Sequence, residues 1–130
     1  MLPFITLITG RQKNGLPTWV NKDCSNLSNT NLSRLKLKGI NLSRSDMYQT
    51  NLSKTDFSGA NLSHTYLCRA NLTGAKLVNA NLRGANLRDA KLTGADLTNA
   101  DLSQAIFNDG TDLPFSKEEA LAKNMVLEKA

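Results

Sequence analysis

Large apolar side chains recur at every fifth position over most of this chain of 130 residues. Seventeen such positions follow one another without interruption from Leu27 to Phe107, and nearly all of them are leucines. A period of five does not fit an α-helix, in which these positions would rotate by about 140° and scatter around the axis. It does not fit a straight strand either, because side chains an odd number of residues apart lie on opposite faces. The chain must therefore turn once in every repeat.

The remaining positions of the repeat agree with a coil that closes on itself. The residue two before each apolar centre is small or apolar, and from Ala70 to Ala105 it is always alanine. Small inward side chains suit a narrow, densely packed interior. The residue just before the centre is usually Asn, Asp or Lys, and the two after it are mostly Ser, Thr, Arg, Gly or Asn, which favour turns and surfaces. We therefore expect two residues of each repeat to point inward and three to point outward.

Segments such as 80–84 (ANLRG) and 95–99 (ADLTN) resemble the pentapeptide-repeat family, whose pattern is A(D/N)LXX. The resemblance covers residues 25–109. It implies an all-β fold, a right-handed quadrilateral β-helix with one pentapeptide on each side and about four coils. Residues twenty apart should then stack, so that Lys36, Asp56, Lys76 and Asp96 would form a ladder of alternating charge.

The ends of such a solenoid need covering, because each coil contacts only its neighbours. We predict a single domain with an N-terminal cap segment at residues 1–24, the β-helix at 25–109 and a C-terminal capping helix within 110–130. Ser116 followed by Glu119 is a capping box, which predicts a helix from about Lys117 to Glu128. We interpret this helix as a lid on the last coil. A role in dimerisation stays open, so the expected state is a monomer or a weak dimer.

The sequence shows no constellation typical of an enzyme. It contains no nucleophile with an adjacent base and no phosphate-binding loop, and its single histidine, His64, has no carboxylate at a stacked position. Cys24 and Cys68 are expected two coils apart, too far for a disulfide and too few for a metal site. We therefore predict two free thiols, unless the N-terminal segment folds over the side that carries Cys68. We also predict no catalytic residues, no cofactor and no bound metal.

One side of the predicted coil stands out as a candidate binding surface. Stacking by twenty residues gathers Tyr48, Tyr66, Arg69 and Arg88 there, together with Cys68, and places Ile106 at the C-terminal end of the same side. Exposed tyrosine and arginine are the residues that dominate protein interfaces. The hypothesis is a scaffold that presents this rigid surface to a protein partner, whose identity the sequence does not reveal. The resemblance to a family frequent in cyanobacteria, some of whose members regulate cell differentiation through protein contacts, adds a regulatory role to that expectation.

The charge of the chain decides between the alternative partners. The chain carries 16 basic and 11 acidic side chains, a net charge of +5. Family members that resemble DNA and act on DNA gyrase have acidic coils, so gyrase mimicry fits this chain poorly. Basic residues such as Arg34, Arg44, Lys54 and Arg83 fall on different sides rather than in one stripe. Nucleic-acid binding is therefore the alternative to protein binding, not the first expectation.

No stretch of the sequence is long enough to span a membrane, and we expect no membrane partner. The apolar segment from Leu2 to Ile8 lacks a basic region before it and a small-residue cleavage site after it. A secretory signal is therefore the weaker interpretation of this segment, and a part of the N-terminal cap the stronger one. The expected location is the cytoplasm.

Overall fold

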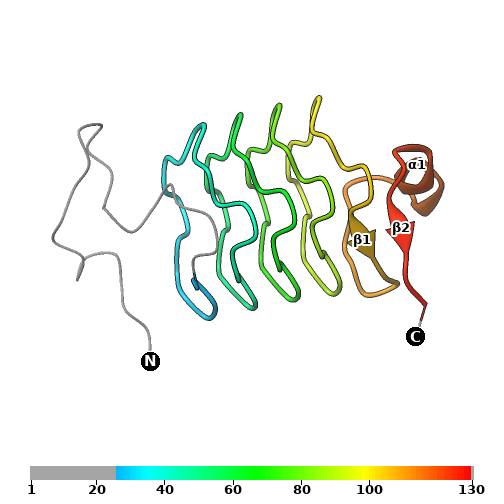
Figure 1. The fold of residues 1–130 in the computed structure, drawn as a ribbon, viewed down its shortest axis with the longest axis horizontal. Coiled ribbons are helices and arrows are strands. Elements are labelled where there is room, and N and C mark those ends of the chain that lie inside the picture. Colours follow the sequence, from blue (N-terminus) through cyan, green and yellow to red (C-terminus); the bar gives the residue numbers. More distant parts are fainter. Residues whose placement is uncertain (1–25, 130) are drawn as a thin grey trace, which may run out of the picture.

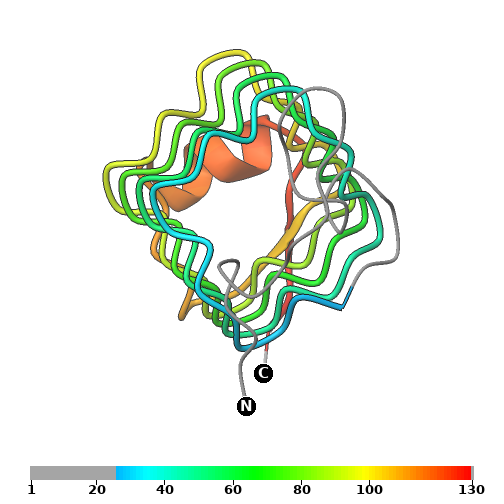
Figure 2. The same ribbon diagram turned by 90° about the vertical axis from the view of Figure 1, so that its left-hand side faces the viewer.

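A computed structural model of the protein describes residues 26–129. The chain winds into a stack of similar coils (Figure 1), and the view along the axis shows a four-sided outline (Figure 2). Parallel backbone bridges join residues twenty apart, from Asn26 with Asp46 through Asn86 with Ile106. Each coil therefore contains four pentapeptides, one on each side. The bridges also confirm the predicted ladder of alternating charge, because Lys36, Asp56, Lys76 and Asp96 pair in that order.

The interior of the coil follows the predicted pattern. Every apolar centre from Leu27 to Leu92 is at most 8% exposed, and the alanines two positions earlier are buried from Ala70 to Ala95. The prediction that two residues of each repeat point inward is therefore confirmed. The predicted N-terminal cap, with the apolar segment at 2–8, lies outside the described residues.

Several inward positions of the earlier coils hold hydroxyl residues instead of alanine. Thr50 and Thr55 donate hydrogen bonds of 2.8 Å to the carbonyl oxygens of Leu27 and Leu32, in the preceding coil. Thr65 donates a bond of 2.7 Å to the carbonyl of Leu62. Because each buried hydroxyl has an acceptor, it avoids the cost of an unsatisfied polar group.

The corners of the coil are type II turns. The residue two after the centre has a positive φ at every corner from Asn29 to Gln104, with values between 56° and 72°. The next residue closes most of these turns with a backbone bond to the centre, as in the 3.0 Å bond from the Ala80 N–H to the Leu77 carbonyl. Five of these corners hold glycine and eleven hold other residues. The left-handed conformation is unfavourable for these eleven non-glycine residues, so the backbone is locally strained at their corners.

The preference for Asn or Asp before the centre has a local cause. In Asn61 the side-chain Oδ1 accepts bonds from the backbone N–H of Ser63 at 3.1 Å and from its Oγ at 2.7 Å. The same arrangement recurs with aspartate, as between Asp101 and Ser103. These Asx turns fix the backbone on each side of the coil, which explains the repeated Asn-Leu-Ser triplets.

The C-terminal region ends the repeat with three short elements. Strand β1 (Ile106–Phe107) pairs in parallel with β2 (Val126–Leu127), and α1 (Lys117–Ala122) lies between them in the sequence. One residue is inserted before α1, because Lys91 pairs with Asp112, twenty-one positions later. Ala120 and Met125 pack into the hydrophobic core, and α1 lies across the end of the coil (Figure 2).

The prediction of a helix as far as Glu128 was wrong at its C-terminal end. The predicted start is correct, since the Glu119 N–H donates to the Ser116 Oγ at 3.1 Å. The helix ends at Ala122 because Asn124 adopts a φ of 63°. The N–H groups of Asn124 and Met125 then bond back to the carbonyls of Leu121 and Ala120, which is a Schellman closure. The chain is thereby released to form β2.

Candidate functional site

The side of the coil centred on Met47, Leu67, Leu87 and Phe107 carries all four residues of the predicted binding surface, and we call it the tyrosine face. Tyr48 and Arg88 directly follow a centre, Tyr66 precedes one, and Arg69 occupies a corner. Along this face the residues before the centres pair in one column, in the order Asp46, Tyr66, Asn86, Ile106 and Val126.

The two tyrosines form a stacked pair in the first half of the tyrosine face. Their ring centroids are 6.0 Å apart and the ring planes differ by 22°. Arg69 donates from Nη1 to the Tyr48 hydroxyl at 3.3 Å, and its Nε lies 4.0 Å from a carboxylate oxygen of Asp89. Tyr66 remains 44% exposed. The result is an aromatic surface whose side chains are held in place by contacts within the chain.

Cys68 lies beneath this surface and interacts with Tyr66. The hydrogen bond with the Cys68 side chain raises the pKa of the Tyr66 phenol above its usual value, so the phenol stays neutral and protonated at physiological pH. Cys68 is buried and free, which confirms the predicted thiol at this position. Cys24 lies outside the described residues.

Arg88 lies further along the tyrosine face, where it forms an ion pair with Glu128. The hydrogen bond to this carboxylate raises the pKa of the Arg88 guanidinium above its usual value. The sequence did not indicate this pair, because Glu128 was expected in a helix. Its position follows from the parallel pairing of β2 with β1, which continues the column of Arg88 and Asn108 to Glu128.

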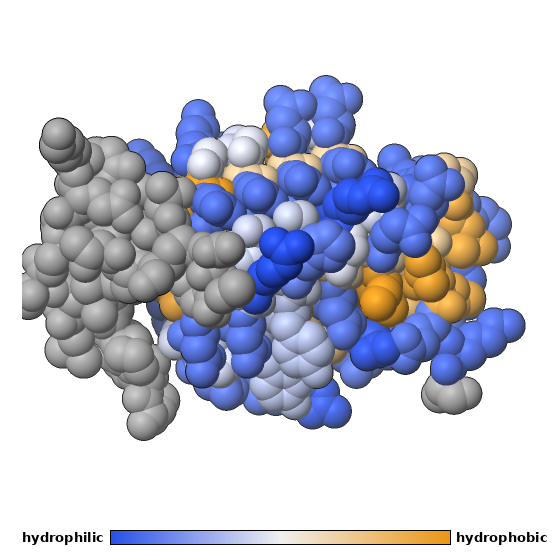
Figure 3. Space-filling model, in the orientation of Figure 1, coloured by the Kyte–Doolittle hydropathy of each residue, from blue (hydrophilic) through white to orange (hydrophobic). Residues whose placement is uncertain are grey.

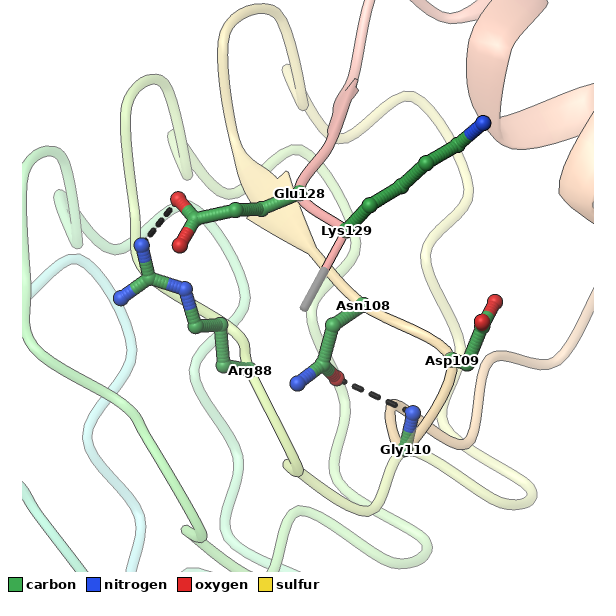
Figure 4. Close-up of a pocket in the computed structure, with 6 residues that line it drawn as sticks. All are labelled: Arg88, Asn108, Asp109, Gly110, Glu128 and Lys129. Atoms are coloured by element: carbon green, nitrogen blue, oxygen red, sulfur yellow. Dashed lines mark hydrogen bonds and ion pairs between the residues drawn. The ribbon is translucent and has the colours of Figure 1, made fainter.

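A shallow pocket of about 340 Å³ opens beside this ion pair. It is lined by Arg88, Asn108, Asp109, Gly110, Glu128 and Lys129. Figure 4 shows Arg88 joined to Glu128 on one side and Asn108 joined to the Gly110 N–H on the other. The charges of Arg88 and Glu128 are therefore already paired with each other, and the residues that line the pocket are polar or charged apart from Gly110.

The other candidate chemical groups lie away from the tyrosine face. His64 is exposed at a different corner, where it packs over Gly84, and a Cβ on Gly84 would lie 2.5 Å from its Nδ1. Within residues 26–129 no three or more His, Cys, Asp or Glu side chains gather in a way that could hold a metal ion. The same part of the chain contains no helix with the length and apolar character needed to cross a membrane.

The cationic side chains concentrate in the first described coil. Residues 26–45 include Arg34, Lys36, Lys38 and Arg44 and no acidic residue. All four side chains are exposed, and none forms an ion pair with another described residue. In the next coil, the pKa of Asp56 is lowered mainly by a hydrogen bond from Ser58 and less by the charges of nearby lysines.

Comparison with known proteins identifies the repeat. The family model described as pentapeptide repeats matches the chain in eight copies, over residues 25–63, 50–89 and 70–109. The solved structure of alr5209, a pentapeptide repeat protein from Nostoc Pcc 7120, is 35% identical, with 82% of this chain and 84% of that protein covered and a TM-score of 0.57. Rfr23, from the cyanobacterium Cyanothece 51142, is 29% identical over 83% of this chain and 86% of its own, with a TM-score of 0.59. None of the curated proteins compared matches the chain. These matches support the quadrilateral β-helix and the expected likeness to cyanobacterial proteins.

Proposed function

Because the chain belongs to the pentapeptide-repeat family, we propose that it is a non-enzymatic scaffold that binds another protein through the tyrosine face. The observation that carries the proposal is the stacked pair of Tyr48 and Tyr66 with Arg69 bonded to the Tyr48 hydroxyl. Tyrosine and arginine are the residues most often found to dominate the binding energy of protein interfaces.

The backbone of the coil supports this proposal. Along the tyrosine face, the residues before the centres from Asp46 to Ile106 are each bridged to the coil before and the coil after, so the side chains have fixed spacing. A preorganised surface loses little conformational freedom on binding and retains more of the contact energy as affinity. The face extends over several bridged coils, and such an extended surface suits a macromolecular partner better than a small ligand, whose sites are concave and mostly apolar.

Affinity capture from a lysate of the source cells tests the proposal. The bait is the full chain, compared with a variant carrying Tyr48→Ala, Tyr66→Ala and Arg69→Ala. A matched control carries Lys36→Ala, Lys76→Ala and Val78→Ala, three outward positions on the opposite side of the coil. We expect one protein to be retained by the intact chain and the control but lost with the tyrosine-face variant, at equal melting temperatures. Equal capture by all three baits would contradict the proposal.

We also propose that the segment after the repeats is a lid that keeps the chain monomeric or weakly dimeric in the cytoplasm. Burial of Ala120 and Met125 in the core and the pairing of β2 with β1 support this role, because both cover the last coil. Deletion of residues 111–130 should therefore produce aggregation or a loss of stability. A soluble, equally stable monomer after this deletion would contradict the lid.

Nucleic-acid binding is the second candidate function, and it is favoured by the four cations of residues 26–45, which form no ion pair with another described residue. Phosphate contacts release counterions, so affinity for duplex DNA would fall by orders of magnitude between about 50 and 200 mM salt if several of these cations bound phosphate. Titration of labelled duplex DNA at both salt concentrations distinguishes the candidates. The protein-binding proposal predicts weak binding with no dependence on Tyr48 or Tyr66. DNA mimicry toward gyrase has the least support, since the net charge is +5.

A further inference from the structure

The side of the coil opposite the tyrosine face carries regularly alternating charge. We call it the ladder side, since the residues before its centres are those of the charge ladder, Lys36, Asp56, Lys76 and Asp96. Between residues 26 and 105, the matching column of each other side holds only one charged residue. On the face that Figure 3 displays, hydrophobic side chains gather toward the end where β1 and β2 lie, and the coils are mostly hydrophilic. On the ladder side, Val78 is the one apolar side chain at the outward positions. A partner of this side is therefore recognised by charge.

The charges of the ladder are not used within the chain. The four side chains form no ion pair with one another or with another described residue. The Asp56 Oδ1 accepts bonds from the Ser58 N–H at 3.0 Å and from its Oγ at 2.7 Å, and Asp96 accepts the same bonds from Thr98 at 3.1 and 2.6 Å. These bonds lower the pKa of both carboxyls, so both are ionised at neutral pH. Each carboxylate is thus fixed through Oδ1, and its Oδ2 accepts no bond from a described residue.

The order of charges along the ladder is complementary to itself when reversed. A two-fold axis that crosses the ladder side between Asp56 and Lys76, perpendicular to the coil axis, places a second copy antiparallel to the first. Lys36 then faces Asp96 of the second copy and Asp56 faces its Lys76, so that four Lys–Asp pairs form across the contact. A shift by one coil would instead place like charges opposite each other, and a parallel arrangement would place Lys36 against Lys38. Like charges directly opposite are destabilising, so the antiparallel register is favoured.

The corners that bound the ladder side have the same self-complementary order. Each of the two corner columns contains two glycines and two longer residues, all with positive φ. The first column is Arg34, Lys54, Gly74 and Gly94, and the second is Gly39, Gly59, Asn79 and Asn99. The glycines lie toward the C-terminal end of the first column and toward the N-terminal end of the second. Reversal of either column therefore places a longer residue opposite each glycine.

The space above the glycines agrees with this arrangement. Asn99 faces Gly39 of the second copy, and Asn79 faces its Gly59. A Cβ on Gly39 or on Gly59 would meet no atom within 4 Å, so the surface is open at both positions. Gly74 differs, because the corner side chain one coil earlier in the same chain lies 3.3 Å from the position of its Cβ. Two of the glycines in the contact thus leave room for a longer side chain of the second copy.

The size of the ladder side predicts a weak dimer. Four strands about 4.8 Å apart extend over about 19 Å, and a side of five residues is at most about 16 Å wide. The plane of contact is therefore about 300 Å² on each chain, or about 600 Å² in total, whereas stable interfaces bury about 1,200–2,000 Å². Exposed ion pairs add little each and are screened by salt. We expect a dissociation constant of about 0.1–1 mM at low salt.

We propose that the ladder side binds a second copy of this chain in an antiparallel two-fold dimer, held by the four Lys–Asp pairs. The inference goes beyond the proposed protein-binding function and does not depend on it. The tyrosine face lies on the opposite side of the coil, so both copies keep it accessible to a partner. Helix α1 takes no part in this contact.

Crosslinking without a spacer tests the register. Unlabelled and ¹⁵N-labelled full-length chains are mixed in equal amounts, a carbodiimide joins lysine amines to carboxylates in contact, and linked peptides are identified by mass spectrometry. We expect a link between Lys36 and Asp96 that joins one labelled and one unlabelled peptide. Within one chain these two residues are three strands apart, about 14 Å, which is beyond the combined reach of their side chains.

Sedimentation equilibrium tests the role of the charges. Asp56→Asn with Asp96→Asn removes the ladder carboxylates but keeps the oxygens that accept the turn bonds. The matched control is Asp46→Asn with Asp101→Asn, which changes the net charge equally at the same repeat position on two other sides. At about 50 mM salt, the ladder variant should dimerise at least tenfold more weakly than the intact chain, since it loses all four pairs, while the control should be unchanged. About 1 M salt should weaken the intact dimer in the same way.

A complementary variant separates loss of charge pairs from loss of structure. Lys36→Asp with Lys76→Asp makes the ladder wholly acidic, so this chain should be monomeric alone. Its equal mixture with the Asp56→Asn and Asp96→Asn variant should associate again, because the lysines of one chain then face aspartates of the other. Melting temperatures confirm that each variant is folded.

Several outcomes would overturn the dimer. They are a monomeric intact chain up to about 1 mM at low salt, a ladder variant that associates as strongly as the control, no recovery in the mixture, and crosslinks confined to single chains. None of these results affects the proposed function, which fails only if capture of a partner does not depend on Tyr48, Tyr66 and Arg69.

Discussion

Replacement of Lys54 by glycine is predicted to stabilise the protein, although it removes a side chain. Lys54 is exposed at a corner of the coil with a φ of 58°. The left-handed conformation costs a non-glycine residue about 1–2 kcal/mol. Glycine avoids this cost but loses about 0.5–1 kcal/mol through its greater freedom in the unfolded chain. Lys54 forms no ion pair with another described residue. The midpoints of these two ranges leave an expected net gain of about 0.75 kcal/mol.

The assay is urea unfolding followed by circular dichroism, with two matched variants. Lys54→Gln removes the charge but keeps the strained corner, so its free energy of unfolding should equal that of the intact chain. Gly74→Ala makes the reverse change one coil later, where φ is 69° and the new Cβ would lie 3.3 Å from the Lys54 Cγ. It should lose about 1 kcal/mol or more. If Lys54→Gly were no more stable than Lys54→Gln, the corners would not store the strain that we infer.

Three further predictions concern the interior and the turns. Leu72→Ala, at a centre that is 0% exposed, should destabilise the chain by about 3–5 kcal/mol in urea unfolding, since it leaves a cavity in a narrow core. Thr55→Val should cost about 1–3 kcal/mol in the same assay, because the Leu32 carbonyl loses its 2.8 Å hydroxyl donor. The hydrogen bond from Thr98 lowers the pKa of Asp96 below its ordinary 3.8. The stability from this carboxylate is therefore present above pH 3.8 and lost as the pH falls through the lowered pKa. Asp96→Asn keeps the side-chain oxygen that accepts the bonds from Thr98 but has no carboxylate to protonate. Its free energy of unfolding should therefore depend less on pH in this acidic range.

The repeating part of the fold could be predicted because every pentapeptide has the same order of turn-forming, buried and corner residues. A single Asn61-Leu62-Ser63 segment encodes an Asx turn, a buried centre and the approach to a corner. Repetition without insertion then leaves the chain no other register. The corners were less predictable, because residues such as Arg44 and His64 do not favour the positive φ that the closed coil imposes on them.

The C-terminal end was predicted less well because two backbone conformations compete after Ala122. The chain can continue as a helix, or Asn124 can adopt the left-handed conformation and end it. Residues 126–127 form backbone bonds to β1 only when the helix ends. Asparagine at the end of an apolar pattern is a known stop signal, and it was the available clue. Its consequence reaches the candidate site, since Glu128 meets Arg88 only in this arrangement.

The candidate site, too, could be predicted only in part. Stacking by twenty residues was enough to place Tyr48, Tyr66, Arg69 and Arg88 on one side. The sequence did not specify that the two rings stack at 6.0 Å or that Arg69 bonds to Tyr48. These contacts depend on rotamers across neighbouring coils, which a pattern of residue types does not encode.

The most direct test of the central claim is the affinity of the captured partner, once purified, for the intact chain and for Tyr66→Ala, measured by isothermal titration calorimetry. Tyr66 points outward from the coil, so its removal should leave the fold unchanged. If the tyrosine face is the interface, Tyr66→Ala should weaken binding about thirtyfold, the effect of losing an interface hot spot of about 2 kcal/mol, while Val78→Ala should bind like the intact chain. Equal affinity of the intact chain and Tyr66→Ala would contradict the claim.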